Sequence, residues 1–190
     1  MCYHRAMSRP GLALAAAFCL GLGGCSSPSA SPTTQPPRDP LRTSASAAPA
    51  VPAPDDAIAR ISAVHGGSGP WVVAGYRMGE YALARLGLAR QSFDLEVIHH
   101  SPRAVQFSCM ADGAAAATGA SLGKLNLSLV VSDEAHTETV YQKKSTGQSL
   151  ALRPTAAFAS RFRDLPREKL AEAGRAVLDL KDEAIFEEVK

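Results

Sequence analysis

Hydrophobic residues recur at helical spacing after residue 54 and again after residue 154, and at strand spacing between those segments. A first helix is predicted to be capped by Asp55 and Asp56 and to end at His65, where two glycines follow. Its apolar face holds Ile58, Ile61 and Val64. A second helix is predicted from Pro70 to Leu86, because proline suits the first helical position and Gly87 can end a helix.

Gly75 and Gly79 stand four residues apart inside the second predicted helix. Glycine lowers helix propensity, so the pair indicates close approach of another backbone or of a ligand. Simple packing against another helix accounts for the two glycines equally well.

The middle of the chain is predicted to form strands. The alternation of Leu125, Leu127, Leu129 and Val131 is typical of a half-buried strand, and Ser145-Thr146-Gly147 is typical of a hairpin turn. The predicted strands are Leu95–His99, Leu125–Val131, Thr137–Lys143 and Ser149–Leu152, with a helix at Val105–Ala117 between the first two.

Helical patterning returns beyond Pro154. Asp164 is placed to cap a helix with Pro166 in its first turn, and Asp182–Val189 supplies a last packing segment. The apolar face of this helix holds Leu170, Ala173, Val177 and Leu178. The order of helices, strands and helices predicts an α+β fold, with helices flanking a small, mainly antiparallel sheet in a single domain at residues 55–190.

The N-terminal residues have the pattern of an export signal. Arg5 and Arg9 precede an apolar run, residues 11–23, that is too short for a permanent membrane span. Leu22-Gly23-Gly24-Cys25 resembles the bacterial lipobox, so residues 1–24 are predicted to be a lipoprotein signal peptide and Cys25 the lipidated N-terminus. An ordinary signal cleaved near Gly24 is the alternative. Lipidation predicts a location in the bacterial cell envelope, periplasmic or on the outer surface, anchored to a membrane without spanning it.

The segment 25–54 is rich in Ser, Ala, Pro and Thr, which predicts a flexible linker. Removal of residues 1–24 takes two of the 20 Lys and Arg and none of the 18 Asp and Glu, so 18 of each remain. This balance provides no basic patch, and we exclude nucleic acid as a partner. Cys2 and Cys19 leave with the signal, so Cys109 remains beside the lipidated Cys25 and no intrachain disulfide is expected.

The stretch from Ser108 to Asn126 concentrates the candidate chemistry. Cys109 is predicted near a helix start, where backbone N–H groups lower a thiol pKa, and Asp112 lies on the same helical face. The pair suits metal ligation or a polarised thiol, and a small buried cysteine beside a local cap fits equally well. Lys124 follows Gly123, but the surrounding spacing is wrong for a phosphate-binding loop.

Four histidines follow the predicted signal peptide: His65, His99, His100 and His136. None has the spacing of a helical zinc site, and the chain has no CxxC motif. His65 is the best candidate, because it ends a helix beside a glycine-rich loop with room for a ligand. His99 and His100 are adjacent on a strand and must point to opposite faces, while His136 is expected in solvent.

Two blocks of the sequence resemble the FmdE family, which takes its name from formylmethanofuran dehydrogenase. The first is His65-Gly66-Gly67-Ser68-Gly69-Pro70, continued by Gly75-Tyr76-Arg77-Met78-Gly79. The second is Cys-x-x-Asp-Gly followed by Thr-Gly-x-x-x-Gly-Lys-x-Asn, here Cys109, Asp112, Gly113, Thr118, Gly119, Gly123, Lys124 and Asn126. The resemblance spans residues 57–190 and implies an α+β domain, often dimeric, with a metal site where the His loop meets the Cys helix.

By this resemblance, His65 and Cys109 are the implied metal ligands, with a divalent metal such as zinc as cofactor. The ligand-binding residues would be His65, Asp112, Thr118 and Lys124. Gly67 and Gly69 replace a second His and a Cys of the family pattern, so two potential metal ligands are absent.

We therefore expect a lipid-anchored envelope protein, a homodimer, whose domain binds a metal ion or a small molecule. One alternative is a thiol- or metal-dependent enzyme of one-carbon metabolism. The other is a structural or interaction module whose site has been lost.

Overall fold

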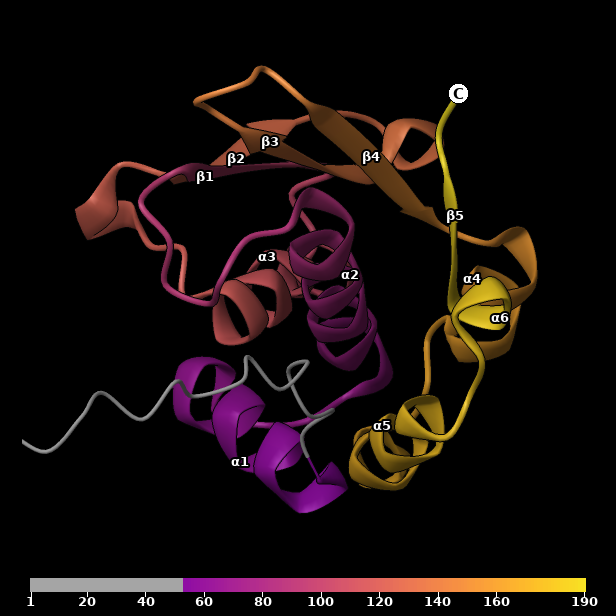
Figure 1. Cartoon of the computed structure of the whole chain (residues 1–190). Coiled ribbons are helices and arrows are strands. Elements are labelled where there is room, and N and C mark those ends of the chain that lie inside the picture. The colour runs from indigo at the N-terminus through magenta and orange to yellow at the C-terminus, as the bar shows by residue number, and fades with distance from the viewer. Residues whose placement is uncertain (1–52) are drawn as a thin grey trace, which may run out of the picture. The chain divides into compact units, whose positions relative to one another are not determined.

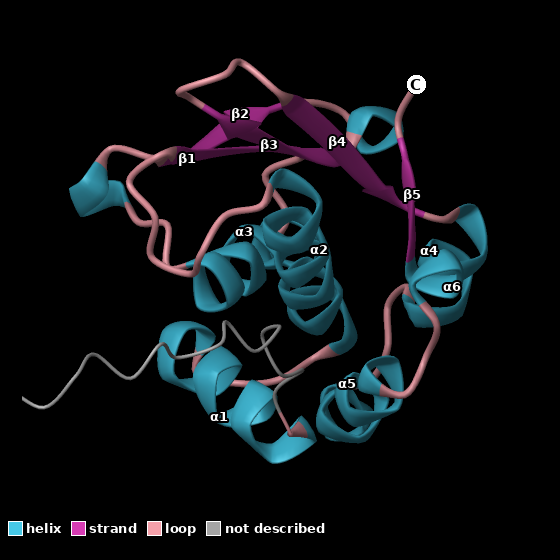
Figure 2. Cartoon of the chain, viewed as in Figure 1, coloured by secondary structure: helices cyan, strands magenta, loops and turns pink. Residues whose placement is uncertain are grey.

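The fold is that of a computed structural model, which describes residues 53–190. The predicted signal peptide, the lipidation site Cys25 and nearly all of the predicted linker lie outside the described residues. The described part holds six α-helices and a five-stranded open sheet in one α+β domain, which confirms the predicted fold class (Figures 1 and 2).

The sheet has the strand order β2-β1-β3-β4-β5. Strands β1 and β2 are parallel, and the other three pairings are antiparallel. The strands are β1 (Leu95–Ser101), β2 (Leu127–Val131), β3 (Glu138–Lys143), β4 (Ser149–Pro154) and β5 (Phe186–Glu188). The predicted hairpin is therefore present as β3 and β4, and the sheet is mainly antiparallel as expected.

The helices are α1 (Pro54–His65), α2 (Pro70–Leu86), α3 (Val105–Thr118), α4 (Ala156–Phe162), α5 (Leu170–Leu178) and α6 (Asp182–Ile185). Helices α2 and α3 lie side by side beneath one face of the sheet, and α1 and α5 lie beyond them (Figure 1). Every second residue of β1, from Leu95 to Ser101, is buried on the helical side. The main core therefore lies between the sheet and the α2–α3 pair.

Helices α2 and α3 touch backbone to backbone. A Cβ atom at Gly75 would fall on the carbonyl of Met110, and one at Gly113 would fall on the carbonyl of Val72. The first glycine thus serves the close approach of another backbone, one of the explanations that the sequence left open. Only residues without a side chain permit this crossing, which fixes the position of α3 relative to the start of α2.

Helix ends follow the predicted glycines more closely than the predicted caps. Helices α1 and α2 end at Gly66 and Gly87, both in the left-handed conformation. The N-cap of α1 is Ala53, so the prediction that Asp55 and Asp56 cap it was wrong, because Pro54 already occupies the first turn. Asp164 does not cap α5 either, because a 3-10 turn at Arg167–Lys169 separates them.

Two further predictions were wrong in the sheet. The last segment was expected only to pack, but it ends as β5, which pairs with β4. Strand β2 starts at Leu127, because Leu125 adopts a left-handed conformation after a 3-10 turn.

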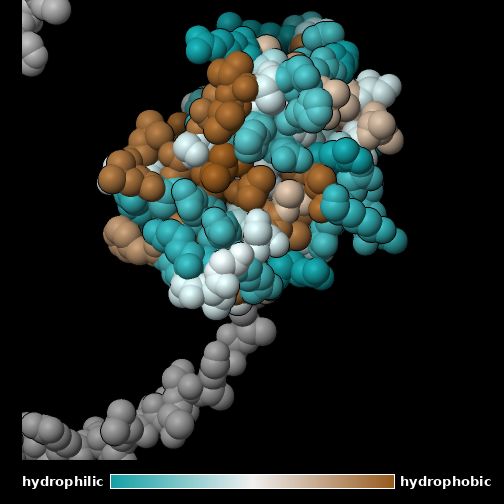
Figure 3. Space-filling model, turned by 90° about the horizontal axis from the view of Figure 1, so that it is seen from above, coloured by the Kyte–Doolittle hydropathy of each residue, from teal (hydrophilic) through white to brown (hydrophobic). Residues whose placement is uncertain are grey.

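The half-burial predicted for β2 is absent, because the strand lies at the edge of the sheet. Its three exposed apolar residues are Leu129, Val130 and Val131. Figure 3, which views the sheet from above, shows apolar side chains gathered on this face of the molecule.

Between residues 53 and 190, no helix has the length and apolar character needed to cross a membrane.

We expect Gly113→Ala to lower the free energy of unfolding by about 3 kcal/mol or more, because the added methyl group displaces the Val72 carbonyl from a packed crossing. Gly123→Ala is the matched control, since a Cβ atom there meets no atom within 4 Å. Chemical denaturation of both variants measures the difference, and equal loss of stability in the two would contradict the crossing.

Candidate functional site

A cleft opens where the end of α1, the loop into α2 and the first turns of α3 meet. His65 and Cys109 line two cavities that share this wall, with volumes of about 520 and 360 Å³. Asp112 lines the smaller cavity. The structure thus brings together His65, Cys109 and Asp112, which were predicted as site residues from two segments more than 40 positions apart.

His65 and Asp112 form the one side-chain hydrogen bond that ties the two motif blocks together across the cleft. The distance from His65 Nδ1 to Asp112 Oδ2 is 2.8 Å, and both side chains are partly exposed, at 25% and 47%. A carboxylate can only accept a hydrogen bond, so Nδ1 carries the proton and donates a hydrogen bond to Asp112. The other ring nitrogen, Nε2, is then left to accept a proton from a ligand or, when the ring is protonated, to donate one.

Cys109 is a buried thiol, 8% exposed, in the second turn of α3. Its Sγ donates a hydrogen bond to the carbonyl of Gln106 at 3.3 Å. Burial, with a smaller contribution from the negative charge of Asp112, raises its pKa to about 12. The expectation that the helix start would lower this pKa was therefore wrong, because desolvation outweighs the helix dipole here.

The loop that follows His65 and leads into α2 is held from the side by α5. A Cβ atom at Gly174 would fall on the carbonyl of Ser68, so this glycine lets α5 lie directly against the loop. Gly66 gives the loop its sharp exit from α1, with a φ of 80°. The position of His65 is therefore set by packing from α5 as well as by Asp112.

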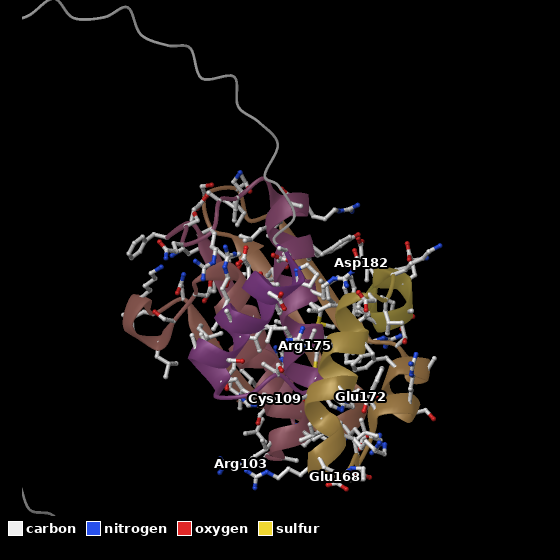
Figure 4. All side chains as sticks on the ribbon, turned by 90° about the horizontal axis from the view of Figure 1, so that it is seen from below. Arg103, Cys109, Glu168, Glu172, Arg175 and Asp182 are labelled. Carbon is white, nitrogen blue, oxygen red and sulfur yellow. The ribbon has the colours of Figure 1, made fainter. Side chains whose placement is uncertain are left out.

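The larger cavity has apolar walls, supplied by Trp71, Val72, Phe162, Leu165 and Leu170. Arg167 also lines this cavity, and it forms no ion pair with the described residues. Figure 4 views the domain from below and labels Cys109 of α3 together with Glu172 and Arg175 of α5. The sequence analysis missed Trp71 and Arg167 as site residues, although Trp71 directly follows Pro70 of the first motif block.

Thr118 and Lys124 lie at the other end of α3 and line neither cavity of the cleft. The hydroxyl of Thr118 donates to the Ala114 carbonyl at 2.7 Å and accepts from the Ala120 N–H at 3.1 Å. Lys124 Nζ donates to the carbonyls of Gly119 and Gln91. Both residues form hydrogen bonds with backbone groups near the C-terminal end of α3, so the second half of the motif stabilises this helix end.

His99 is fully buried and holds the start of α3 to the sheet. Its Nε2 donates to the Phe107 carbonyl at 3.1 Å, and the hydroxyl of Thr139 donates to Nδ1 at 2.9 Å. Burial lowers its pKa to about 4, so the ring is neutral at physiological pH. His100 points to the other face of the strand, as predicted, and His136 is exposed beside Asp133.

The donor set of the cleft does not fit a zinc centre of the kind that the resemblance implies. Zinc sites use three or four protein ligands. Within residues 53–190, no group of three or more His, Cys, Asp or Glu side chains is arranged to hold a metal ion. The cleft offers one free imidazole nitrogen and one thiol, because the carboxylate of Asp112 is already hydrogen-bonded to His65.

Comparison with known proteins gives one family match. The model of the family described as FmdE, Molybdenum formylmethanofuran dehydrogenase operon, matches residues 64–187, which include the whole cleft. No curated protein matches the chain.

We expect Cys109 of the folded protein to be alkylated at pH 7.5 at least about a hundredfold more slowly than in denaturant, because only the thiolate reacts. Mass spectrometry of the peptide that contains Cys109 follows this thiol alone. Asp112→Asn should reduce the difference between the two alkylation rates, since it removes a negative charge that raises the pKa of Cys109. Equal rates in folded and denatured protein would contradict the buried neutral thiol.

We expect stability to fall as the pH is lowered from about 6.5 to about 4, because the unfolded chain binds a proton at His99 in this range and the folded chain does not. The loss attributable to His99 should reach roughly 3 kcal/mol at the lower pH. Denaturation across this range should show a smaller dependence of stability on pH in His99→Gln than in the wild-type protein.

Proposed function

The chain belongs to the FmdE family, and from that premise we propose that it is a cell-envelope lipoprotein whose domain binds a small organic molecule in the His65 cleft. The hydrogen bond between His65 and Asp112 is the observation that carries the proposal. Asp112 fixes the ring orientation and leaves Nε2 available, which is the arrangement of a histidine prepared to contact a ligand.

The walls of the cleft favour an anion with an apolar body. Apolar side chains of α2, α4 and α5 surround most of the cavity, which suits a hydrocarbon chain or ring. Arg167 supplies a guanidinium with no ion-pair partner in the described part of the chain, and its planar donors match a carboxylate. A small aliphatic carboxylate would meet both requirements, with its oxygens accepting hydrogen bonds from Arg167 and from the Nε2–H of a His65 ring that carries a proton on both nitrogens.

A binding role is better supported than a thiol-dependent reaction. A nucleophilic cysteine needs a lowered pKa or an adjacent base. Cys109 instead has a raised pKa, and its hydrogen bond goes to a backbone carbonyl. In the proposed complex Cys109 supplies a neutral wall between the two cavities.

The envelope location rests on the N-terminal sequence. The basic residues, the short apolar run and the lipobox-like tetrapeptide ending at Cys25 support export and lipidation. A lipid at Cys25, followed by a tract rich in Pro, Ser and Ala, would hold the binding domain close to a membrane.

Octanoate is a suitable probe, and Trp71 is a built-in reporter because it lines the cleft and is the only tryptophan of the chain. We expect saturable quenching or enhancement of its fluorescence with octanoate and none with octylamine, whose charge is opposite. His65→Gln and Arg167→Gln should each weaken binding about tenfold, since each removes a charge-assisted hydrogen bond.

Arg175→Gln is the matched control, because Arg175 pairs with Asp55 on the surface and lines neither cavity of the cleft. Equal binding of octanoate and octylamine, or wild-type affinity in His65→Gln, would refute the proposed site. Metal analysis of the same preparations, with Cys109→Ala beside the wild type, tests a metal-binding role separately.

A further inference from the structure

A third cavity, which we call the α4 cavity, lies between α4, β4 and the 3-10 turn η2 (Glu134–His136), with a volume of about 510 Å³. It shares only Trp71 with the larger cavity of the His65 cleft, so the tryptophan forms a wall between two separate spaces. This volume lies within the range of small-molecule sites, about 300–1,000 Å³. None of the residues that carry the family resemblance lines it.

The floor of the α4 cavity is aromatic and apolar. Trp71 and Phe107 meet edge to face, with their ring centroids 5.1 Å apart. Pro154, Ala156 and Ala159 continue the apolar surface around them. Such a floor can receive a ring or a branched side chain, because aromatic edges and faces pack against apolar groups.

The rim of this cavity carries two pairs of opposite charges. Arg163 binds both carboxylate oxygens of Glu134, and Arg153 Nε donates to Glu187 Oε1 at 2.7 Å. All four side chains are between 40% and 49% exposed. Exposed ion pairs contribute little to stability, about 0–1 kcal/mol, so either pair can open for a ligand at small cost.

One residue that lines the cavity has a buried hydroxyl group without a partner among the described residues. Thr137 lines the cavity and is 6% exposed, and its buried Oγ1 has no hydrogen-bond partner in the described structure. The β1–β3 register pairs His100 with Glu138, so Ser101 and Thr137 come next at the same end of the sheet. The Oγ of Ser101 is also buried without a partner among the described residues. Buried hydroxyls usually find partners, so these two are unsatisfied polar groups at the end of the sheet that adjoins the cavity.

We propose that this cavity binds a small zwitterion with an apolar body, of the class of an aromatic α-amino acid. A ligand with one charge would open an arginine–glutamate pair and leave one partner without a counterion. A zwitterion exchanges partners instead: its carboxylate takes the arginine, its ammonium takes the glutamate, and no charge is left unpaired.

The pair of Arg163 and Glu134 is the one that receives the ligand. Arg163 lies over the ring of Phe107, 5.8 Å from its centroid, so a carboxylate on this guanidinium brings the apolar body to the aromatic floor. Glu134 is on the same short segment as Thr137, which places the ammonium on the side of the buried hydroxyl. Arg153 and Glu187 remain paired on the other side of the cavity.

Three probes test the charge requirement on the full chain: L-phenylalanine, its amide without the carboxylate, and its N-acetyl derivative without the ammonium. Fluorescence of Trp71 reports binding, since phenylalanine adds no competing tryptophan signal. We expect a saturable change with phenylalanine and at least about tenfold weaker binding of both derivatives, because each lacks one charged hydrogen-bonding group. Arg163→Gln and Glu134→Gln should each weaken phenylalanine binding to a similar extent, and Arg175→Gln should not.

The probe series requires no variant, so it decides the charge requirement even if a substitution disturbs folding. Absence of saturation, or equal affinity for the three probes, overturns the proposal. Loss of phenylalanine binding in His65→Gln but not in Arg163→Gln also overturns it, because the ligand would then occupy the other cleft. Octanoate binding should depend on His65 and not on Arg163. The two experiments can therefore refute either proposed site without refuting the other.

Discussion

Two helix backbones meet where Val72 and Gly75 of α2 face Met110 and Gly113 of α3, and the rest of the domain is arranged around that contact. It brings the first turns of α3 to the beginning of α2, next to His65 at the end of α1. Because neither helix can shift without a backbone clash, Asp112 is held at hydrogen-bonding distance from the imidazole. The same contact between α2 and α3 therefore fixes both the packing of the core and the geometry of the cleft.

Much of the fold could be predicted from local signals, and the errors share a cause. Pro70 and Gly87 predict where α2 begins and ends, and the structure confirms both positions. The leucines of β2 alternate as a half-buried strand does, yet the strand is an exposed edge, because burial depends on which strand lies beside it. The β5 segment, Phe-Glu-Glu, is too short and too acidic to indicate a strand, and only its pairing with β4 makes it one.

The candidate site was predictable in part for a similar reason. His65, Cys109 and Asp112 were selected from two motif blocks, and the structure brings them to one cleft. Thr118 and Lys124 belong to the same second block, but the length of α3 carries them to its far end, where they bind backbone carbonyls. Residue spacing could not show that Cys109 is buried, so the direction of its pKa shift was predicted wrongly. Trp71 separates the two larger cavities, although it belongs to no motif.

The burial of Cys109 also has a consequence for the chemistry of the protein outside its binding sites. Thiol–disulfide exchange requires a thiolate with access to the partner sulfur. Cys109 is protonated and 8% exposed, so it meets neither requirement. In an oxidising compartment, mixed disulfides, sulfenic acid and covalent dimers would therefore form slowly at this position. The thiol of Cys109 can therefore stay reduced in such a compartment while the domain is folded.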